Sequence, residues 1–559
     1  MSAASIPQDN FLERICRQLS SNPAATFLQE VAGTKGRSAT GSELLSLVAE
    51  ARTFLRSAHL RRGDRCALHA PNSIKWVALD LAIMAEGLIA VPVYSRQAAS
   101  ELAAMLRDCS PALVISGDTE LRDAIAAEWP EHPRIAVLDE VFFDPPTTNL
   151  LTSPPTTLAA TDPVTIIYTS GTSGEAKGVI LTVANLDHML RCTGERLDVL
   201  MSGHSGQEHV FHYLPFCFAG SWILLLTSLL RASFFTLATD LGKIAEDMRA
   251  ASPHYFLNVP VLLERMRVGI NEQLRKTGGI AHTIYERAQD AWFRRRMGDE
   301  SASWFWLWLA NLIVLPTIRR KVVGDNLRGL ICGSAPLAIE TQLFFMMLAI
   351  PVLQVYGLTE TTAICTMDYP GRVEPGFVGP AIPQVEMKLG EQDEILVRGP
   401  NIFPGYWNRP EATAKALRDG WFHTGDQGEV NPAGNWRIIG RLKNLIVLSS
   451  GHNVAPEPIE DMILHLLPSA LQVVLVGHGK PFVAAIITGN VTRDEVTQAL
   501  EITNPQWPHY KRVRSFYIRP EPFTVDSGLL TVNGKLRRDA ITARFQAQIE
   551  EMYSATSVA

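Results

Sequence analysis

The chain of 559 residues contains few cysteines, little charge and no apolar run of membrane-spanning length. Its seven cysteines form no C-x-x-C pair and have no regular spacing, so they predict neither a zinc site nor a disulfide framework and favour a reducing compartment. The most apolar stretch, 304–315, has twelve residues, whereas a spanning helix needs about 20. Because the first residues lack the apolar core of a secretory signal, we expect a cytoplasmic protein.

Charged residues make up 19% of the chain and hydrophobic residues 47%, which is typical of a globular protein rather than a disordered one. The 51 basic and 57 acidic residues leave a net charge of −6, and this balance argues against nucleic acid as a main partner. The length exceeds that of a single hydrophobic core and therefore predicts two or more domains.

Hydrophobic periodicity predicts an α/β arrangement in the first hundred residues. Apolar residues recur at helical spacing over 42–60 and 73–86, whereas 66–69 and 88–94 have the composition of strands. This alternation is typical of a sheet with helical crossovers.

The character of the chain changes again near Gly440. Polar turns give way there to a segment of mixed strands and helices that runs to the end. We therefore predict a large N-terminal domain over 1–440 and a smaller C-terminal domain over 441–559.

The most informative segment is a glycine-rich loop between two apolar strands. A β-branched and aromatic run ends at Tyr168, the loop consists almost wholly of Gly, Ser and Thr, and a second strand follows at Gly178. Such a loop allows close backbone approach and offers hydroxyls and N–H groups together, which suits polyphosphate oxygens. Lys177 adds a positive charge. An ordinary turn is disfavoured because 169–175 contain no large apolar side chain.

The P-loop of nucleotide-hydrolysing proteins is the obvious alternative for this segment, and it fails on spacing. That motif requires G-x-x-x-x-G-K-[ST] before a helix. Here Gly171 and Gly174 are too close together, and Lys177 is followed by Gly178 and a strand.

The loop closely resembles the phosphate-binding signature of the adenylate-forming enzymes, which include acyl-CoA synthetases, luciferases and peptide-synthetase adenylation domains. Later segments match the family's other motifs in the same order, so the resemblance covers nearly the whole chain. They are Gly333-Ser-Ala-Pro336, Gln354-Val-Tyr-Gly-Leu-Thr-Glu-Thr-Thr362, Gly420-Trp-Phe-His-Thr-Gly-Asp426, the segment 438–460 and Leu530-Thr-Val-Asn-Gly-Lys-Leu-Arg-Arg538. The resemblance implies an α/β and α+β fold: a large N-terminal domain of two layered α/β sheets plus a small β-barrel, and a smaller, mobile α+β C-terminal domain.

The resemblance also implies a site for ATP and Mg²⁺. Tyr356 would lie against the adenine ring, Thr359 would contact the α-phosphate, and Glu360 would hold the metal together with Thr169. This agrees with the chemistry, because a hard cation that bridges phosphates needs one or two carboxylate oxygens. The other nucleotide-binding residues that the resemblance implies are Ser170, Gly171, Thr172, Ser173, Gly174, Gly333, Ser334, Ala335, Pro336, Gly357 and Ile438.

Asp426 and Arg441 would bind the sugar. Since Asp426 follows a glycine, we expect an exposed loop carboxylate. In the family this aspartate accepts hydrogen bonds from both ribose hydroxyls, a role that carboxylates also have in dinucleotide folds. Arg441 would contact the ribose or a phosphate.

Three lysines have implied roles in the chemistry. Lys535 matches the catalytic lysine that neutralises charge on the carboxylate and the α-phosphate, and Lys177 adds its charge at the glycine loop. Adenylation brings two anions together, so a fixed positive charge lowers the barrier directly. Lys443 occupies the hinge about which the C-terminal domain rotates.

Coenzyme A is the implied thiol acceptor, with Ser450, Gly451 and His452 along its channel. Relatives often carry Lys-Asp and Ser-Gly-Gly-Lys where this chain has Lys443-Asn444 and Ser449-Ser-Gly-His452. Because this loop helps to admit the thiol, a carrier-protein thiol is kept as an alternative acceptor.

The carboxylate substrate would bind along 213–222, where the resemblance points to Phe216, Phe218 and Trp222. Fatty acyl-CoA synthetases often have His where this chain has Phe218. Trp222 falls where some long-chain enzymes place a gating tryptophan, although a core tryptophan fits equally well. An insert over about 269–323 and the segment 519–531 resemble the long-chain branch.

The apolar stretch 304–315 is flanked by the basic triplets 294–296 and 319–321. We expect a buried helix with solvated charged ends. The alternative is an interfacial segment that rests on a membrane with its aromatic side chains at headgroup level.

His209 and His212 invite a metal interpretation, which we disfavour. They lie on a predicted strand, where positions three apart face opposite sides. We also find no Ser-His-Asp order and no zinc spacing elsewhere.

Together these features predict a long-chain-type fatty acid–CoA ligase that forms an acyl-adenylate from a medium- to long-chain monocarboxylate and ATP. Two alternatives stay open within the family: an acyl-AMP ligase that serves a carrier protein, and a ligase for aryl or other carboxylates. A third is a non-catalytic lipid-binding protein, against which Lys535, Glu360 and Asp426 argue.

Overall fold

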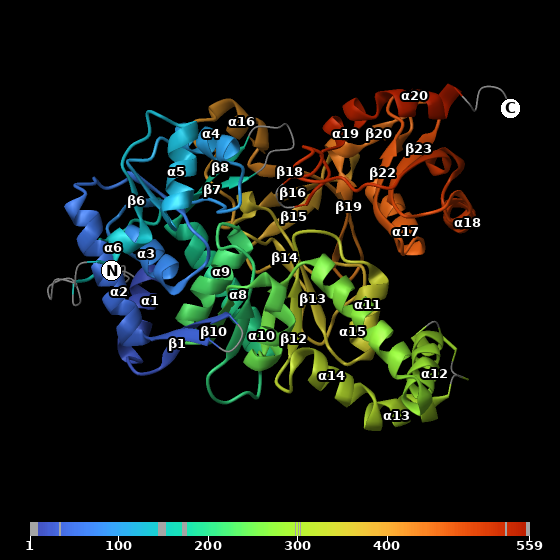
Figure 1. The fold of residues 1–559 in the computed structure, drawn as a ribbon, viewed down its shortest axis with the longest axis horizontal. Helices are drawn as coiled ribbons and strands as arrows, with labels where there is room; N and C mark the ends of the chain where they lie inside the picture. The colour runs from blue at the N-terminus through green and yellow to red at the C-terminus, as the bar shows by residue number, and fades with distance from the viewer. Residues whose placement is uncertain are drawn as a thin grey trace, which may run out of the picture.

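The computed structural model describes residues 9–32, 35–143, 153–169, 176–296, 298–299, 301, 303–531 and 534–554. An eight-stranded sheet, which we call the first sheet, lies at the centre of the N-terminal part (Figure 1). Six of its strands pair in parallel, and one antiparallel strand closes each edge. Its order is β14 (Thr366–Met367), β13 (Val352–Tyr356), β12 (Gly329–Cys332), β11 (Tyr255–Asn258), β9 (His209–His212), β10 (Phe234–Ala238), β1 (Thr26–Ala32) and β2 (Lys35–Thr40).

A second, six-stranded sheet carries the glycine-rich segment at one edge. Its strands run parallel except at this edge, where the two strands that flank the loop pair antiparallel. Its order is β6 (Ile135–Val137), β5 (Leu113–Ser116), β3 (Arg65–His69), β4 (Ile89–Pro92), β7 (Pro163–Thr169) and β8 (Lys177–Thr182). The strands predicted over 66–69 and 88–94 are therefore confirmed as β3 and β4.

Helices fill the space between these sheets and cover their outer faces. The helices of the N-terminal part are α1 (Phe11–Ser21), α2 (Gly41–Ser57), α3 (Ile74–Ala85), α4 (Ala99–Cys109), α5 (Thr119–Glu128), α6 (Leu138–Val141), α8 (Val183–Leu200), α9 (Ala219–Leu230), α10 (Ile244–Ala251), α11 (Pro260–Thr277), α12 (Gly279–Arg296), α13 (Trp304–Ile313), α14 (Leu315–Val323), α15 (Ile339–Met347) and α16 (Pro410–Ala416). The helices predicted over 42–60 and 73–86 are confirmed as α2 and α3.

Strict alternation along the central strands explains this layering. Val210 and Tyr255 point into the core shared with α1, α2, α3, α8 and α9, which also contains the inner face of the second sheet. Their neighbours Phe211 and Phe256 point into a separate core beneath α10 to α15. Because successive side chains of a strand face opposite sides, a strand buried on both faces is expected to be mostly apolar.

A third sheet of five antiparallel strands lies at the place of the predicted small barrel. It consists of β15 (Glu386–Leu389), β16 (Glu394–Arg398), β17 (Leu417–Arg418), β18 (Trp421–Val430) and β19 (Trp436–Arg441). Strand β18 is the longest and pairs with β16, β17 and β19, so it ties the sheet together.

The C-terminal part has its own hydrophobic clusters, which are built from residues after 445. It contains the hairpin β20 (Ile446–Val447) and β21 (Asn453–Val454), the sheet β22 (Ala470–Val476), β23 (Val483–Gly489) and β24 (Val513–Arg519), and the helices α17 (Glu457–Leu466), α18 (Arg493–Thr503), α19 (Arg538–Arg544) and α20 (Gln546–Ser554). The mixed α and β content predicted for this part is observed. The domain boundary near residue 440 stays a prediction.

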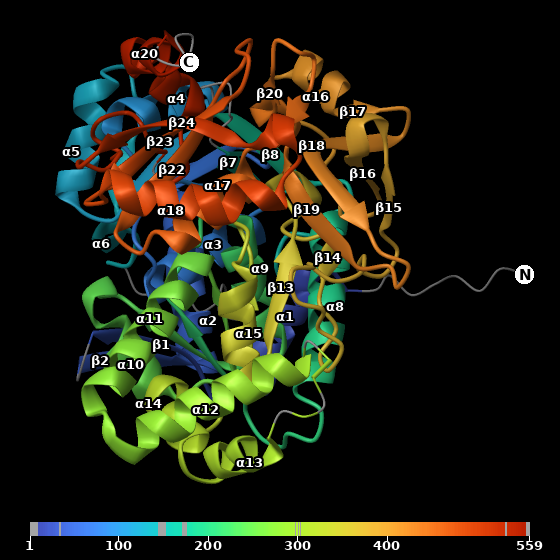
Figure 2. The ribbon, with the colours of Figure 1, turned by 90° about the vertical axis from the view of Figure 1, so that its right-hand side faces the viewer.

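Helix α13 corrects an expectation from the sequence. The helix predicted over 304–315 forms, but its interpretation as a buried helix is wrong for one face. Leu307 and Ala310 are buried, whereas Trp304 and Trp308 are 66% and 59% exposed. In both views α12 and α13 lie at the end of the molecule opposite the C-terminal part (Figures 1 and 2). Among the described residues, no helix combines the length and the apolar character needed to cross a bilayer.

Candidate active site

Tyr356, Asp426 and Arg441 meet where β13 ends. The Tyr356 hydroxyl donates a hydrogen bond to Asp426 Oδ2 at 2.7 Å, and Arg441 Nε lies 2.7 Å from Asp426 Oδ1. Tyr356 is the last residue of β13, and Asp426 pairs directly with Arg441 between β18 and β19. A carboxylate can accept about four hydrogen bonds, so Asp426 keeps capacity for sugar hydroxyls. The structure thus brings together three residues that the resemblance assigned to the nucleotide.

The expectation that Asp426 is an exposed loop carboxylate is wrong. Its side chain is only 3% exposed, and the residue lies within β18. Gly425 has a φ of 70°, but the irregularity is absorbed by a bulge in the β16–β18 pairing and the strand continues. Burial raises the pKa of Asp426, and the charge of Arg441 followed by the hydrogen bond from Tyr356 opposes this rise.

Lys535 and Lys443 add positive charge beside the same aspartate. Loss of solvent and then the neighbouring Arg441 lower the pKa of Lys535, while Asp426 and Glu360 oppose the change. Desolvation, then Arg441, lowers the pKa of Lys443 to about 8. Arg441 thus contacts the buried carboxylate directly, and both lysines lie close enough to interact with its charge. The excess of positive charge suits a polyphosphate, which would neutralise it.

Glu360 and Lys177 are linked by a residue that the sequence reasoning missed. The Tyr406 hydroxyl donates to Glu360 Oε1 at 2.8 Å, and Lys177 Nζ lies 5.2 Å from the centre of the Tyr406 ring. Tyr406 is held there because 405–407 run beside β8: Val179 and Tyr406 form an isolated bridge. A cation over an aromatic face is attracted to it. The only sequence signal for Tyr406 is an aromatic pair after Pro404-Gly405.

The glycine-rich loop is largely outside the described residues, which include none of Ser170, Gly171, Thr172, Ser173 and Gly174. Its two ends are described. Thr169 ends β7 and pairs with Lys177 across the hairpin, and the Thr169 hydroxyl lies 3.5 Å from the Lys177 carbonyl oxygen. A Cβ on Gly178 would lie 2.7 Å from Ile166 Cγ2. This position therefore requires glycine for close packing.

The turn Gly333–Pro336 follows β12 as predicted and leads into α15. Gly333 is buried, whereas Ser334, Ala335 and Pro336 are exposed, and Ser334 adopts a left-handed φ of 74°. A Cβ on Gly333 would lie 2.6 Å from Val355 Cγ2, so glycine lets this turn approach β13. The exposed turn lies next to the strand that carries Tyr356, and its contact with a purine stays a prediction.

Gly357 and the residues after it make a tight turn beside Tyr356. A Cβ on Gly357 would lie 2.3 Å from the Ala363 carbonyl oxygen. Thr359 opens a short 3-10 turn that also contains Glu360. This turn directs Glu360 toward Tyr406, whose hydroxyl donates to the carboxylate. Ile438, the last of the predicted nucleotide-binding residues that the structure describes, is half-buried on β19.

Glu360 fits the requirements of Mg²⁺. Magnesium binds hard oxygen ligands and usually takes one or two carboxylates together with substrate phosphates. Glu360 provides a carboxylate whose orientation is fixed by Tyr406, and the Thr169 hydroxyl provides a second hard oxygen. The metal would neutralise phosphate charge when it is bound with ATP.

The predicted coenzyme A loop lies at the β20–β21 hairpin. Ser450 Oγ lies 3.0 Å from His452 Nδ1, and the His452 ring stacks on Tyr510 with ring centres 4.3 Å apart. Gly451 has a left-handed φ of 82°, which fits the need for glycine in this turn. The described contacts of this loop are with the C-terminal part itself.

The three predicted acyl-pocket residues have different surroundings. Phe216 is fully buried and packs on Trp76 with ring centres 5.1 Å apart. Phe218 is half-buried and lies beside Tyr94, with ring centres 6.0 Å apart. Phe216 and Trp76 belong to the buried core, whereas Phe218 and Tyr94 keep part of their surface exposed.

Trp222 is fully buried on α9, and its indole N–H donates to Asp80 Oδ2 at 2.7 Å. Burial raises the pKa of Asp80 to about 7. These contacts favour a core tryptophan over a gate. Asp80 was missed because a single acid in an otherwise apolar helix carries no motif.

His209 and His212 have separate environments. His212 is fully buried and stacks on Phe216, and burial lowers its pKa to about 3. His209 is half-buried, and its backbone N–H donates to His254 Nδ1 at 2.9 Å. Within the described ranges, no group of three His, Cys, Asp or Glu side chains could hold a metal ion.

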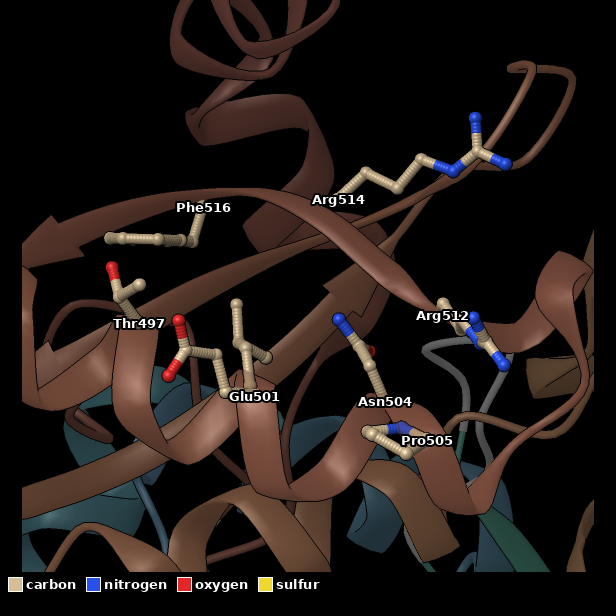
Figure 3. Close-up of a pocket in the computed structure, with 8 residues that line it drawn as sticks. Thr497, Glu501, Asn504, Pro505, Arg512, Arg514 and Phe516 are labelled. Atoms are coloured by element: carbon tan, nitrogen blue, oxygen red, sulfur yellow. The ribbon is translucent and has the colours of Figure 1, made fainter.

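A depression of about 360 Å³ lies outside this site, between α18 and β24 (Figure 3). Its lining residues are Thr497, Leu500, Glu501, Asn504, Pro505, Arg512, Arg514 and Phe516. It belongs to the C-terminal part and shares no residue with the cluster around Asp426.

The fold and the cluster around Asp426 are those of a nucleotide-binding enzyme with a large N-terminal part and a smaller C-terminal part. The chain belongs to the AMP-binding enzymes, the adenylate-forming family: the family model "AMP-binding enzyme" matches residues 12–407, and "AMP-binding enzyme C-terminal domain" matches residues 443–557.

Relatives within this family cover almost the whole chain. The long-chain-fatty-acid–CoA ligase FadD15 of Mycobacterium bovis is 28% identical over 98% of this chain and 97% of its own. A chloroplastic long-chain-fatty-acid–[acyl-carrier-protein] ligase of Arabidopsis thaliana, AEE15, is 25% identical over 89% of this chain and 80% of its own. The o-succinylbenzoate coenzyme A synthetase of Bacillus subtilis, solved with ATP and a magnesium ion, has a TM-score of 0.74 at 18% identity and covers 95% of this chain and 99% of its own. This structural likeness confirms the predicted fold class.

Proposed function

We propose that the protein activates a medium- to long-chain fatty acid with ATP and transfers the acyl group to coenzyme A. The observation that carries this proposal is the cluster in which Tyr356 and Arg441 contact Asp426. The charges of Lys535 and Lys443 interact with the same aspartate, and that of Glu360 interacts with Lys535. Adenylation joins two anions, and these cations would offset the charge that builds up in the transition state.

The reaction would proceed in two steps. A carboxylate oxygen of the acid attacks the α-phosphorus of ATP, the bond to the β-phosphate oxygen breaks, and pyrophosphate leaves. The thiol sulfur of coenzyme A then attacks the acyl carbon, the bond to the AMP oxygen breaks, and the thiol proton passes to solvent. Between the steps the C-terminal part would rotate about Lys443, so that Lys535 leaves and the Ser450–His452 loop arrives.

Support for a fatty acid comes from two independent sources. Phe218 and Tyr94 form an aromatic pair that is only half-buried, and such an apolar surface suits an alkyl chain. FadD15 of Mycobacterium bovis is named a long-chain-fatty-acid–CoA ligase and aligns over nearly the full length.

Carboxylate-dependent exchange of pyrophosphate into ATP tests the first step. We expect exchange with medium- or long-chain acids, and a fall of about 100-fold or more in Lys535→Ala, because one preorganised charge is removed from the transition state. Lys415→Ala, an exposed lysine on α16, is the matched control and should exchange like the wild type. Absence of exchange with short, long and aryl acids would contradict adenylation.

A carrier-protein thiol is the second candidate acceptor. The His452 side chain replaces the lysine common in relatives, and AEE15 of Arabidopsis thaliana is named an acyl-carrier-protein ligase. AMP release measured with and without coenzyme A separates the two. Exchange without consumption of coenzyme A would support the carrier protein and contradict the CoA-ligase proposal alone.

An aryl carboxylate is the remaining alternative, and half-buried Phe218 beside Tyr94 is its support, because these rings could narrow the pocket. A panel of acids decides between a fatty and an aryl substrate: kcat/KM should rise with alkyl chain length for a fatty acid ligase.

We also propose a cytoplasmic setting, since all seven cysteines are free and most are buried thiols.

A further inference from the structure

Helix α13 exposes a stripe of large apolar side chains. Trp304, Phe305, Trp308, Leu312 and Ile313 are each more than half exposed, at 66%, 55%, 59%, 63% and 53%. Leu307 and Ala310 on the opposite side are buried in the core beneath α10 to α15. Soluble proteins rarely expose so much contiguous apolar surface without an interaction that uses it.

Basic side chains surround this stripe. The segment 279–323 has seven Arg and Lys residues against four Asp and Glu residues, although the whole chain has a net charge of −6. The Arg295 guanidinium lies 4.4 Å from the centre of the Trp304 ring, and the Arg287 guanidinium lies 5.0 Å from that of Trp306. Cationic and aromatic groups in contact are the combination suited to phosphate headgroups above an acyl layer.

Acidic neighbours neutralise only part of this charge. Arg294 Nη2 lies 2.6 Å from Asp299, and Arg320 Nε lies 2.9 Å from Asp325. Arg319 and Lys321, at the other end of the stripe, have no acidic partner within salt-bridge distance among the described residues. Both ends of the apolar face therefore carry positive charge.

We propose that α13 is a membrane-docking surface that rests on an anionic lipid bilayer, with Trp304, Phe305 and Trp308 inserted at headgroup level. With ten residues the helix cannot span, but a helix that lies in the plane of the interface needs only one apolar face and flanking cations. A second copy of the chain is a poorer occupant. A twofold contact through α13 would set the basic residues of one copy close to those of the other.

Docking of this kind would bring the enzyme to the lipid bilayer, which holds long alkyl chains. The docking proposal rests on the exposed surface alone and does not depend on which acid the enzyme uses. The projection of α12 and α13 away from the C-terminal part leaves that part clear of the bilayer (Figure 2).

Flotation with vesicles tests the proposal directly. We expect the full-length protein to float with vesicles of equimolar phosphatidylcholine and phosphatidylglycerol and to bind them less tightly at high salt. Trp304→Ser with Trp308→Ser should weaken binding about tenfold or more, since two interfacial indoles are removed. Arg319→Gln with Lys321→Gln should weaken it about tenfold on anionic vesicles, with little effect on phosphatidylcholine alone.

The matched control is Leu471→Ser with Ile502→Ser, which removes two side chains of similar exposure, 56% and 54%, from the C-terminal part. This variant should float like the wild type. Pyrophosphate exchange with a water-soluble acid should be unchanged in every surface variant, which shows that they fold.

Three outcomes would overturn the inference. The first is a wild-type protein that does not float, and the second is a tryptophan variant that floats as well as the wild type. The third is a dimer, seen by sedimentation without lipid, that the tryptophan substitutions dissociate, because a second copy would then occupy the face. A wild type that floats but shows no exchange would contradict the proposed function and leave the docking surface standing.

Discussion

Asp426 and Arg441 lie directly opposite each other in the β18–β19 pairing, with Arg441 Nε 2.7 Å from Asp426 Oδ1. The pair holds a carboxylate inside the protein that would otherwise be costly to bury. It also fixes the orientation of Asp426 beside Tyr356, so the acceptor oxygens are in place before a nucleotide arrives.

This arrangement predicts that Asp426 recognises the ribose hydroxyls. Asp426→Asn should lower kcat/KM for ATP about 10- to 100-fold, because hydrogen bonds to a charged acceptor are worth about 1.5–3 kcal/mol each. The wild type should prefer ATP to 2′-deoxy-ATP, and the variant should lose most of this preference. Pyrophosphate exchange at varied nucleotide concentration measures both kcat/KM for ATP and the preference for ATP over 2′-deoxy-ATP.

Asp419→Asn is the control, since Asp419 lies in an exposed turn before the same strand. It should keep the wild-type preference. An Asp426→Asn enzyme that still discriminates between the two nucleotides as the wild type does would show that the carboxylate does not contact the sugar.

The lowered pKa of Lys443 predicts that ATP affinity and the free energy of unfolding change in opposite directions as pH rises. Its pKa is lowered to about 8, so the side chain loses its charge above that pH and attracts phosphates less. ATP affinity should therefore fall as pH rises through about 8. Without nucleotide, the unfolded chain holds this proton up to about pH 10.4, so the free energy of unfolding should rise with pH across the same window.

Lys443→Arg separates this effect from other titrations, because arginine stays charged. The variant should lose the part of the pH dependence of the ATP Kd that comes from position 443. Calorimetry between pH 7 and about 9 measures the ATP Kd and the free energy of unfolding. Identical pH profiles of these two quantities in the variant would exclude Lys443 as the source of their pH dependence.

Site residues that lie within local sequence motifs could be predicted from the sequence. The burial and position of residues that depend on packing between distant segments could not. Tyr356, Asp426 and Arg441 lie in recognisable segments, and the structure brings them together. Burial of Asp426 was missed because the preceding glycine indicates a turn, whereas neighbouring strands absorb it as a bulge. Tyr406 gains its position only from pairing with β8.

Helix α13 shows a second limit of prediction from sequence. Apolar residues at helical spacing predict a helix, and the helix forms. Whether its faces are covered depends on elements elsewhere in the chain, and hydropathy alone favours burial for every large apolar residue. Trp304 and Trp308 are exposed because α13 packs through its other face, where Leu307 and Ala310 are buried and Trp306 and Leu309 are partly buried.

Gly357 should be irreplaceable for steric reasons. A Cβ there would lie 2.3 Å from the Ala363 carbonyl oxygen and 2.4 Å from Ile364 Cα, and both obstacles are backbone. Gly357→Ala should lower the free energy of unfolding by about 1–3 kcal/mol and raise KM for ATP, because the turn that carries Thr359 and Glu360 must move. Chemical denaturation and exchange kinetics measure the two effects.

Gly194→Ala is the matched control with the opposite sign. Gly194 lies within α8, and no atom would lie within 4 Å of an added Cβ. Alanine should raise the free energy of unfolding by about 0.5–1 kcal/mol, since glycine is the poorer residue inside a helix. If both substitutions shifted stability equally, steric crowding at Gly357 would not be the cause.

Asp80 should make the protein less stable as pH rises from acid to neutral. Burial raises its pKa to about 7, and the Trp222 N–H opposes this only in part. The unfolded chain releases this proton near pH 4, so between about pH 4 and 7 the folded state binds more protons and the free energy of unfolding falls.

Asp80→Asn keeps a hydrogen-bond acceptor for Trp222 and has no charge to bury. It should match the wild type near pH 4 and exceed it by about 2–4 kcal/mol above pH 7, since each pKa unit corresponds to about 1.4 kcal/mol. Urea denaturation at both pH values measures the difference, and a gap that does not change with pH would show that Asp80 keeps an ordinary pKa in the fold.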